Sequence, residues 1–234
     1  MKAMILAAGR GTRLQSLTAN RPKALVEVGG VALLEHVARR LAAAGVTEVV
    51  INLHHCGDQI PPFVESRGRF GLRRVEYSPE PELLDTGGGL KKAADFFDDG
   101  RPFLVHNVDV LSDIDLAALL RAHAASGALA TLAAKARPTA RPLLFDSDGS
   151  LVGRVSADHV DTLVRPPKGD PAALGYCGIQ AVSPALFRRM TETGAFSIVD
   201  CYLRLAARGA AIRVHRVDGA AWRDCGRPAD LRPL

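Results

Sequence analysis

Short apolar runs alternate with segments of helical periodicity through the first half of this 234-residue chain. Residues 2–8, 48–53 and 103–106 are such runs, and their apolar and β-branched content predicts buried strands. Residues 31–44 and 115–126 place apolar side chains at helical spacing, and a glycine follows each segment. Strands and helices in alternation predict βαβ units, and therefore a mainly parallel sheet that binds ligands at the carboxyl ends of its strands.

The pattern changes in the second half of the chain, where two apolar runs flank a turn signal. Residues 143–146 and 151–155 lie on either side of Asp148-Gly149, a pair that suits a tight hairpin turn. Further strands are expected over residues 175–182 and 211–217, and further helices over residues 88–97 and 197–207. No repeat or low-complexity linker interrupts the sequence, so we expect one domain over residues 1–234, an α/β fold with an antiparallel elaboration in its second half.

Composition disfavours several classes of protein. Hydrophobic residues make up 47% of the chain, enough for a sizeable core, and no apolar run approaches the roughly 18 residues of a membrane span. The apolar stretch after Lys2 ends at Gly9, too early for a signal peptide, so we expect a cytoplasmic protein with no membrane partner. The net charge is +5, but the arginines are spread along the chain and aromatic residues make up only 5%, which disfavours a nucleic-acid surface.

A glycine-rich segment directly follows the first predicted strand. Gly9 and Gly11 are separated by one residue, a spacing that lets backbone N–H groups turn toward a phosphate. Arg13 adds a planar guanidinium that can bind two phosphate oxygens at once. A dinucleotide-binding fingerprint would need a third glycine where Leu14 stands, and a P-loop would need Gly-Lys-Ser/Thr, which is absent. By itself, the pair of glycines is also compatible with an ordinary strand-to-loop turn.

Residues 6–14, LAAGRGTRL, and RPKAL at 21–25 together make a much more specific pattern. They resemble the opening signature of the sugar-1-phosphate nucleotidylyltransferases, LAAGxGTRLxPLTxxxPKxL, and Ser16 is the one departure, where the family usually has proline. Three later segments resemble the same family: LDTGGGL at 84–90, HNVD at 106–109 and WRDCGRP at 222–228. The resemblance covers nearly the whole chain and implies a Rossmann-like nucleotidyltransferase fold with a mainly parallel central sheet.

The resemblance implies roles for residues in each of these segments. Arg13 would stabilise charge on the phosphates, and Lys23 would bridge them and align the attacking group. Asp109 and Asp224 would hold a catalytic Mg²⁺, and because neither is expected in the core, their replacement is expected to spare the fold. A valine at Gly88 is expected to block binding of the base and sugar and to change thermal stability little. The substrate-binding residues would be Leu6, Ala8, Gly9, Gly11, Thr12, Thr86, Gly87, Gly88, Asn107 and Gly178.

Some of the family's pattern is missing from this chain. Val108 replaces a glycine in the HNVD segment. Cys225 and Arg227 differ from the usual residues of the WRDCGRP segment. Relatives often carry Glu-Lys-Pro, with the lysine on the sugar phosphate, where this chain has VRPP at 164–167. Lys168 could take the place of that lysine or be a solvated loop residue. The residue that holds the sugar phosphate is therefore left open.

The implied reaction joins a nucleoside triphosphate to a sugar 1-phosphate and releases pyrophosphate. Our first choice of substrates is UTP and an N-acetylmuramate-like sugar 1-phosphate, because the muramate-type enzymes have a similar triple-glycine segment. A guanylyltransferase acting on mannose or heptose 1-phosphate and a cytidylyltransferase acting on a non-sugar phosphate are alternatives. A nucleotide-sugar-binding regulator without turnover is an alternative of another class, and the presence of all four charged site residues argues against it. We expect a monomer or a small homo-oligomer with no nucleic-acid partner.

Overall fold

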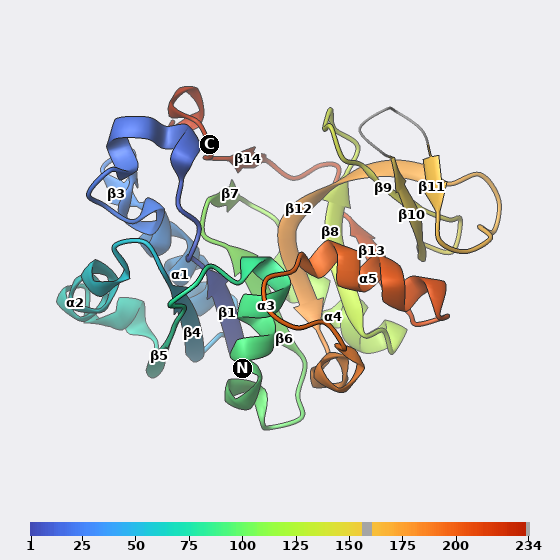
Figure 1. Ribbon diagram of the computed structural model, residues 1–234, viewed down its shortest axis with the longest axis horizontal. Helices are drawn as coiled ribbons and strands as arrows, with labels where there is room; N and C mark the ends of the chain where they lie inside the picture. The colour runs from blue at the N-terminus through green and yellow to red at the C-terminus, as the bar shows by residue number, and fades with distance from the viewer. Residues whose placement is uncertain (156–160, 233–234) are drawn as a thin grey trace.

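The computed structural model describes residues 1–155 and 161–232 and contains one ten-stranded mixed sheet (Figure 1). Four parallel strands form its first half, in the order β5-β4-β1-β6. These strands are β1 (Lys2–Leu6), β4 (Glu48–Leu53), β5 (Arg74–Pro79) and β6 (Phe103–Asn107). The chain starts in the middle at β1, moves outward through β4 and β5, and returns to the other side of β1 with β6. The carboxyl ends of β1 and β6 therefore flank the topological switch point, where open α/β sheets bind ligands.

The second half of the sheet is antiparallel and is built around the long strand β12 (Ala172–Val182), which pairs with β6, β8 and β9. β10 and β11 extend beyond β9, and β13 is parallel to β8. These strands are β8 (Ala130–Lys135), β9 (Leu143–Phe145), β10 (Leu151–Val155), β11 (Asp161–Leu163) and β13 (Ile212–Arg216). The predicted α/β fold, a mainly parallel central sheet with an antiparallel elaboration, is confirmed.

Two small sheets accompany the large one. The first pairs β7 (Val110–Ser112) with β14 (Trp222–Asp224), and the second pairs β2 (Glu27–Val28) with β3 (Val31–Ala32). Strands of two or three residues are too short to show an alternating pattern, so the sequence did not predict them. The β7–β14 pairing matters for the site because it brings the end of the chain to the segment that follows β6.

Five α-helices in the described part of the chain cover the two faces of the sheet, and short 3-10 helices join many of the elements. The α-helices are α1 (Leu33–Ala43), α2 (Ile60–Ser66), α3 (Asp85–Lys92), α4 (Leu116–Ser126) and α5 (Ile198–Ala207). The 3-10 helices span Thr12–Thr18, Lys23–Leu25, Gly57–Gln59, Gly68–Gly71, Ala94–Phe97, Pro184–Arg189 and Pro228–Asp230. No helix in the described ranges is long and apolar enough to cross a membrane.

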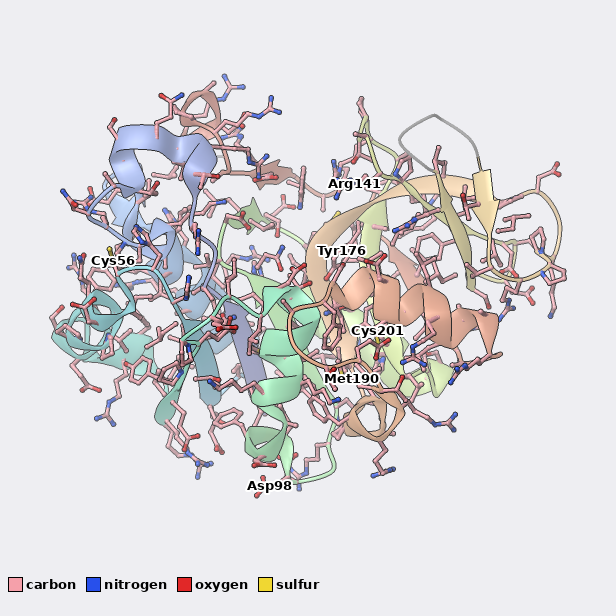
Figure 2. All side chains as sticks on the ribbon, in the orientation of Figure 1. Cys56, Asp98, Arg141, Tyr176, Met190 and Cys201 are labelled. Carbon is pink, nitrogen blue, oxygen red and sulfur yellow. The ribbon has the colours of Figure 1, made fainter. Side chains whose placement is uncertain are left out.

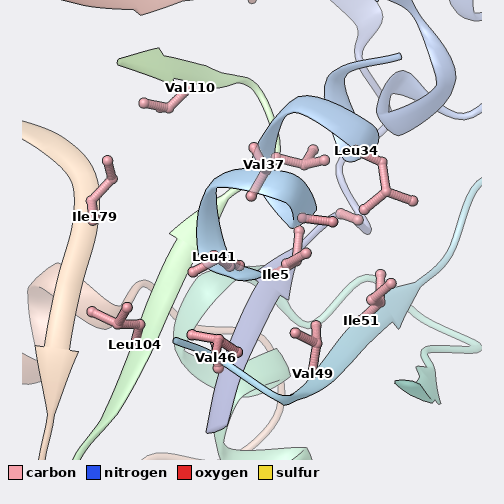
Figure 3. Close-up of a cluster of buried hydrophobic side chains, with 14 of the residues drawn as sticks. Ile5, Leu34, Val37, Leu41, Val46, Val49, Ile51, Leu104, Val110 and Ile179 are labelled. Carbon is pink, nitrogen blue, oxygen red and sulfur yellow. The ribbon is translucent and has the colours of Figure 1, made fainter. Parts of the chain in front are cut away.

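Alternate residues of each strand point to opposite faces, so the sheet has a core on either side. Ile5 of β1 belongs to the core formed with α1, α2 and α4, whereas the preceding Met4 belongs to the core formed with α3 and α5. Figure 3 shows the first of these cores, with Val37 and Leu41 of α1 lying over the strands that carry Ile5, Val49 and Leu104. The two packed faces hold β1 and β6 rigidly, and with them the loops at their carboxyl ends.

One helix departs from the sequence-based expectation. The helix expected over residues 88–97 begins at Asp85 and ends at Lys92 as α3, and a separate 3-10 turn covers Ala94–Phe97. Three consecutive glycines thus lie inside α3, although each costs roughly 1 kcal/mol relative to alanine in a helix. Close packing explains their presence, because a Cβ on Gly88 would overlap the carbonyl oxygen of Gly194.

Candidate active site

A cavity of about 320 Å³ lies at the carboxyl ends of β1 and β6, where the sheet topology predicts a ligand site. The predicted residues that line it are Leu6, Ala8, Gly9, Gly11, Thr12, Arg13, Lys23, Thr86, Asn107 and Asp109. Residues that line the cavity beyond the predicted site residues are Asn52, Leu83, Asp85, Val108 and Gly226. The tertiary structure therefore gathers segments that are far apart in the sequence around one cavity.

The glycine-rich loop after β1 is held in a fixed shape. Gly11 has a φ of +64°, and a Cβ at this position would come within 3.0 Å of Thr18 Cγ2 and 3.1 Å of Lys23 Cβ. The carbonyl oxygen of Gly11 accepts hydrogen bonds from the Leu14 N–H, at 2.8 Å, and from the Thr18 hydroxyl, at 3.0 Å. Only glycine fits here without strain, and the bonded loop places the exposed Arg13 at the mouth of the cavity.

Lys23 and Asp109 form an ion pair on the floor of the cavity. The ammonium of Lys23 donates a hydrogen bond to Asp109 Oδ2, and Lys23 is buried whereas Asp109 is partly exposed. A buried ammonium without a carboxylate partner is costly, so this pair stabilises the loop that carries Lys23. The predicted catalytic lysine and one predicted metal ligand are thus in direct contact.

Asp224 lies beside this pair because β14 is bonded to β7. Asp224 is the register partner of Val110, and the N–H of Cys225 donates to the carbonyl oxygen of Asp109 at 2.8 Å. Burial, and then the nearby charge of Asp109, raises the pKa of Asp224. The Asp224 Oδ1 atom is buried and has no hydrogen-bond partner among the described residues. Two carboxylates close together, one with an unpartnered oxygen, form a position that suits a cation.

Asp109 and Asp224 are a pair of carboxylates and not part of a larger cluster of metal-ligating side chains among the described residues. No group of three or more His, Cys, Asp or Glu side chains in the described part of the chain is placed to hold a metal ion. A divalent ion between Asp109 and Asp224 would therefore take its remaining oxygen ligands from water or from a bound substrate, as Mg²⁺ commonly does.

Gly226 allows Arg13 and Asp224 to approach the same point. A Cβ at Gly226 would come within 2.7 Å of both Arg13 Nη2 and Asp224 Oδ1. Any larger residue would push the guanidinium or the carboxylate away. Gly226 belongs to the WRDCGRP segment identified from the sequence. The reason for a glycine there follows only from the positions of the Arg13 and Asp224 side chains.

Asn52 and Glu80 are functional candidates that the sequence reasoning missed. Asn52 Oδ1 accepts hydrogen bonds from the N–H groups of Ala7, at 2.6 Å, and Ala8, at 3.3 Å, while its Nδ2 donates to Glu80 Oε1 at 2.8 Å. The other carboxylate oxygen of Glu80 accepts from the Leu84 N–H at 2.9 Å. This buried network ties the loop after β1 to the residues before α3. A polar residue near the end of the apolar run 48–53 was the available signal.

The predicted residues around α3 and β12 divide into cavity residues and packing residues. Thr86 lines the cavity, and its hydroxyl oxygen accepts from the Ile198 N–H at 3.0 Å. Gly87 and Gly88 are buried inside α3 and do not line the cavities described here. Gly178 has a φ of +72°, and a Cβ there would come within 2.9 Å of Asn107 Nδ2, so this glycine makes room for the Asn107 side chain.

A second cavity, of about 760 Å³, adjoins the first through Asp85, Thr86 and Asn107. Its wall comes from β9, β10, β12 and the start of α5, and Figure 2 labels two of its residues, Tyr176 on β12 and Arg141 just before β9. The arginines that line it are Arg137, Arg141 and Arg154. Arg154 forms an ion pair with Asp200 at 2.7 Å. No ion pair joins Arg137 or Arg141 to a carboxylate of the described residues.

Lys168 does not lie at either cavity. Its ammonium pairs with Asp148 at 2.5 Å, in the turn between β9 and β10, and its side chain is 70% exposed. Lys168 is therefore a solvated loop residue rather than a substitute for the missing lysine of the family pattern. The structure leaves Arg137 and Arg141 as the cations of the second cavity without an acidic partner in the described ranges.

Sequence comparisons show which known proteins this chain is similar to. The nucleotidyl transferase family model matches residues 2–233. The N-acetylmuramate alpha-1-phosphate uridylyltransferase of Caulobacter vibrioides is 36% identical, over 97% of this chain and 92% of the relative. The mannose-1-phosphate guanylyltransferase catalytic subunit beta of Dictyostelium discoideum is 37% identical, over 99% of this chain but 62% of the relative.

Solved structures share the fold at lower sequence identity. HddC from Yersinia pseudotuberculosis complexed with GMP-PN superposes with a TM-score of 0.76 at 21% identity, over 98% of this chain and 96% of that one. A UDP-glucose pyrophosphorylase complexed with UDP-glucose gives a TM-score of 0.79 at 17% identity, over 98% and 95% of the two chains. These similarities support the same Rossmann-like fold.

Proposed function

Because this chain belongs to the nucleotidyl transferase family, we propose that it joins UTP to the 1-phosphate of an N-acetylmuramate-type sugar, giving a UDP-sugar and pyrophosphate. The observation that carries this choice of sugar is the second cavity, where Arg137 and Arg141 have no acidic partner in the described ranges. N-acetylmuramate 1-phosphate carries two anionic groups, the phosphate and the lactyl carboxylate, whereas mannose 1-phosphate carries only the phosphate. Two unpaired guanidinium groups match a substrate with two anions.

The reaction requires no covalent bond to the protein. An oxygen of the sugar phosphate attacks the α-phosphorus of the nucleotide in line, and the bond from that phosphorus to the β-phosphate oxygen breaks. Pyrophosphate leaves with the electron pair of that bond. Catalysis then rests on positioning and on stabilising charge that grows in the transition state.

The charged residues of the first cavity suit that task. Arg13, at the mouth of the cavity, would stabilise charge around the α- and β-phosphates through its two-donor fork. Lys23 has three N–H donors, so it can contact phosphate oxygens while it remains bonded to Asp109. The backbone of residues 9–12 would hold the triphosphate, and Leu6 and Ala8 would lie against the nucleoside.

Asp109 and Asp224 would hold a magnesium ion, which when bound neutralises charge on the triphosphate and on the leaving pyrophosphate. The unpartnered buried oxygen of Asp224, next to a second carboxylate, supports this assignment. Lys23 pairs with Asp109, and the charges of Lys23 and Arg13 act on Asp224, so two cations accompany the two carboxylates.

Transfer from GTP to mannose or heptose 1-phosphate is the second candidate function. The similarity to the Dictyostelium guanylyltransferase subunit, at 37% identity, supports it as strongly as sequence identity alone supports the first. The cavity residues separate the two candidates, because a neutral sugar offers nothing to Arg141 beyond hydroxyl groups.

A substrate matrix tests the proposal. Five nucleoside triphosphates are combined with N-acetylmuramate, N-acetylglucosamine, mannose and glucose 1-phosphates in the presence of Mg²⁺, and pyrophosphate release is followed. N-acetylglucosamine 1-phosphate is the matched control, because it lacks only the lactyl ether. We expect UTP with N-acetylmuramate 1-phosphate to give the highest kcat/KM, and Arg141→Met to reduce its advantage over the control by at least tenfold. A higher kcat/KM for GTP with mannose 1-phosphate would support the second candidate instead.

A further inference from the structure

We propose that Arg137 holds the phosphate of the sugar 1-phosphate, in place of the lysine that this chain lacks at residues 164–167. The proposal rests on the proposed reaction class, a sugar 1-phosphate attacking a nucleotide, but not on which sugar or base is used. Arg137 lies in the loop after β8, a different part of the chain from the segment that carries the lysine in the family pattern.

The guanidinium of Arg137 is held in place by its neighbours before any ligand binds. Its Cζ atom lies 4.0 Å from the centroid of the Trp222 ring, a close cation–π contact. It also packs on the backbone of Gly175, where a Cβ would come within 2.7 Å of Arg137 Nε and 2.8 Å of Cγ. Glycine at position 175 is therefore required for Arg137 to lie where it does.

Arg137 keeps unused hydrogen-bond donors. Its Nη2 donates to the carbonyl oxygen of Tyr176 at 2.8 Å and its Nη1 to that of Pro138 at 3.3 Å. A guanidinium has five N–H groups, so three remain, and the Nε atom is buried without a partner among the described residues. Nη1 and Nη2 each use one N–H on a backbone carbonyl, so the second N–H on each is left for the oxygens of an anion.

Arg137 forms no ion pair with the described residues, and Asp218, which accepts from the neighbouring Ala136 N–H, is paired with Arg216. Cys177 on β12 is an ionisable neighbour of Arg137, and burial raises the pKa of this thiol to about 11, so it is uncharged at neutral pH. The indole N–H of Trp222 donates to the carbonyl oxygen of Cys177 at 2.9 Å, which fixes the ring on which Arg137 lies. A rigid cation that forms no ion pair with the described residues is suited to a phosphate.

Arg137 lies in the second cavity and against the strand that carries Asp224. Arg137 lines the second cavity, and its stacking partner Trp222 precedes Asp224 by two residues on β14. A phosphate on Arg137 would therefore lie in the second cavity, near the strand that carries Asp224. The other cations nearby fit less well, since Arg154 is bonded to Asp200 and Lys168 to Asp148.

Steady-state kinetics on four variants test the proposal, with KM measured separately for the nucleotide and for the sugar 1-phosphate. Arg137→Met removes the cation, Arg137→Lys retains charge without the fork, and Gly175→Ala displaces the guanidinium with its charge intact. Lys168→Met, which removes a cation outside both cavities, is the control. Each variant is assayed with N-acetylmuramate and with N-acetylglucosamine 1-phosphate.

We expect Arg137→Met and Gly175→Ala to raise the KM for both sugar 1-phosphates by at least tenfold and by the same factor, with the KM for the nucleotide within twofold of wild type. Arg137→Lys is expected to recover part of the loss, and Lys168→Met to behave as wild type. An unchanged nucleotide KM also shows that the variants are folded.

Three results would overturn the proposal. An unchanged sugar-phosphate KM in Arg137→Met refutes it while the proposed function stands. A loss confined to N-acetylmuramate 1-phosphate assigns Arg137 to the carboxylate instead. Wild-type protein without turnover on any substrate pair refutes the proposed function itself, and the role of Arg137 with it.

Discussion

Replacing Asp224 by asparagine is expected to abolish most activity and to leave the metal-free protein at least as stable as wild type. Asp224 is an acid whose pKa is raised by burial and by the charge of Asp109, so its ionised form is disfavoured in the folded protein. Asparagine keeps the size and the acceptor oxygen and removes the charge. Solvent and the nearby charges of Lys23 and Arg13 screen the interaction between the two carboxylates. The substitution therefore raises the free energy of unfolding by only about 0–1 kcal/mol.

The loss of activity is expected to be much larger than this change in stability. If Asp224 supplies one of two protein ligands to the metal, turnover falls by about two orders of magnitude or more, a loss of roughly 2.7 kcal/mol of transition-state stabilisation. The sign of the pH dependence follows from the raised pKa. The penalty for ionised Asp224 is complete above its folded pKa, shrinks as the pH falls below that value, and vanishes below the unfolded pKa, so the difference in stability between variant and wild type shrinks in acid.

Thermal unfolding in EDTA and after addition of Mg²⁺, together with pyrophosphate release, measures both effects. Mg²⁺ is expected to raise the Tm of wild type and to have little effect on the Tm of Asp224→Asn. Asp109→Asn is the contrasting variant, because it removes the partner of the buried Lys23 and should cost about 1–3 kcal/mol. The sequence-based expectation that both carboxylates can be replaced without harm to the fold is therefore withdrawn for Asp109. Metal-free Asp224→Asn that is less stable than wild type by more than about 1 kcal/mol, or that retains near-normal turnover, would refute the reasoning.

Further variants test the rest of the site and the core. Arg13→Ala should mainly lower kcat, and Arg13→Lys should recover little of the lost kcat. Lys23→Ala should also raise the KM for the nucleotide. A wild-type kcat/KM in Arg13→Ala would refute the role of Arg13 in the mechanism. Gly88→Val should unfold or strongly destabilise the protein rather than block binding alone, since its side chain would overlap the carbonyl oxygen of Gly194, and a Tm near that of wild type would contradict this. Burial lowers the pKa of His106 from 6.5 to about 4, so the unfolded chain takes up the proton first and stability should fall by about 2 kcal/mol between pH 7.5 and pH 5. A pH series of melts on His106→Gln, which should lose this fall in stability, checks the assignment.

Local sequence determined the parts of this protein that depend on residues close together in the chain. The apolar runs and helical periods predicted the main strands and helices, and the hairpin around Asp148-Gly149 has the expected turn. The loop that holds Gly9, Gly11 and Arg13 directly follows its strand, so its place at the carboxyl end of β1 follows from the parallel-sheet rule. Asp109 was found in the same way, because it follows β6.

Tertiary structure alone decided the contacts that join distant segments. The buried Asn52–Glu80 pair, the packing of Gly88 against residue 194, and the position of Arg137 between Trp222 and Gly175 each link elements that no local pattern relates. The sequence pattern does not distinguish Asn52 and Gly175 from ordinary strand residues. Periodicity indicates which face of an element is buried, but it carries no information on which atoms of another element lie against that face. In this protein those atoms determine where the guanidinium of Arg137 lies.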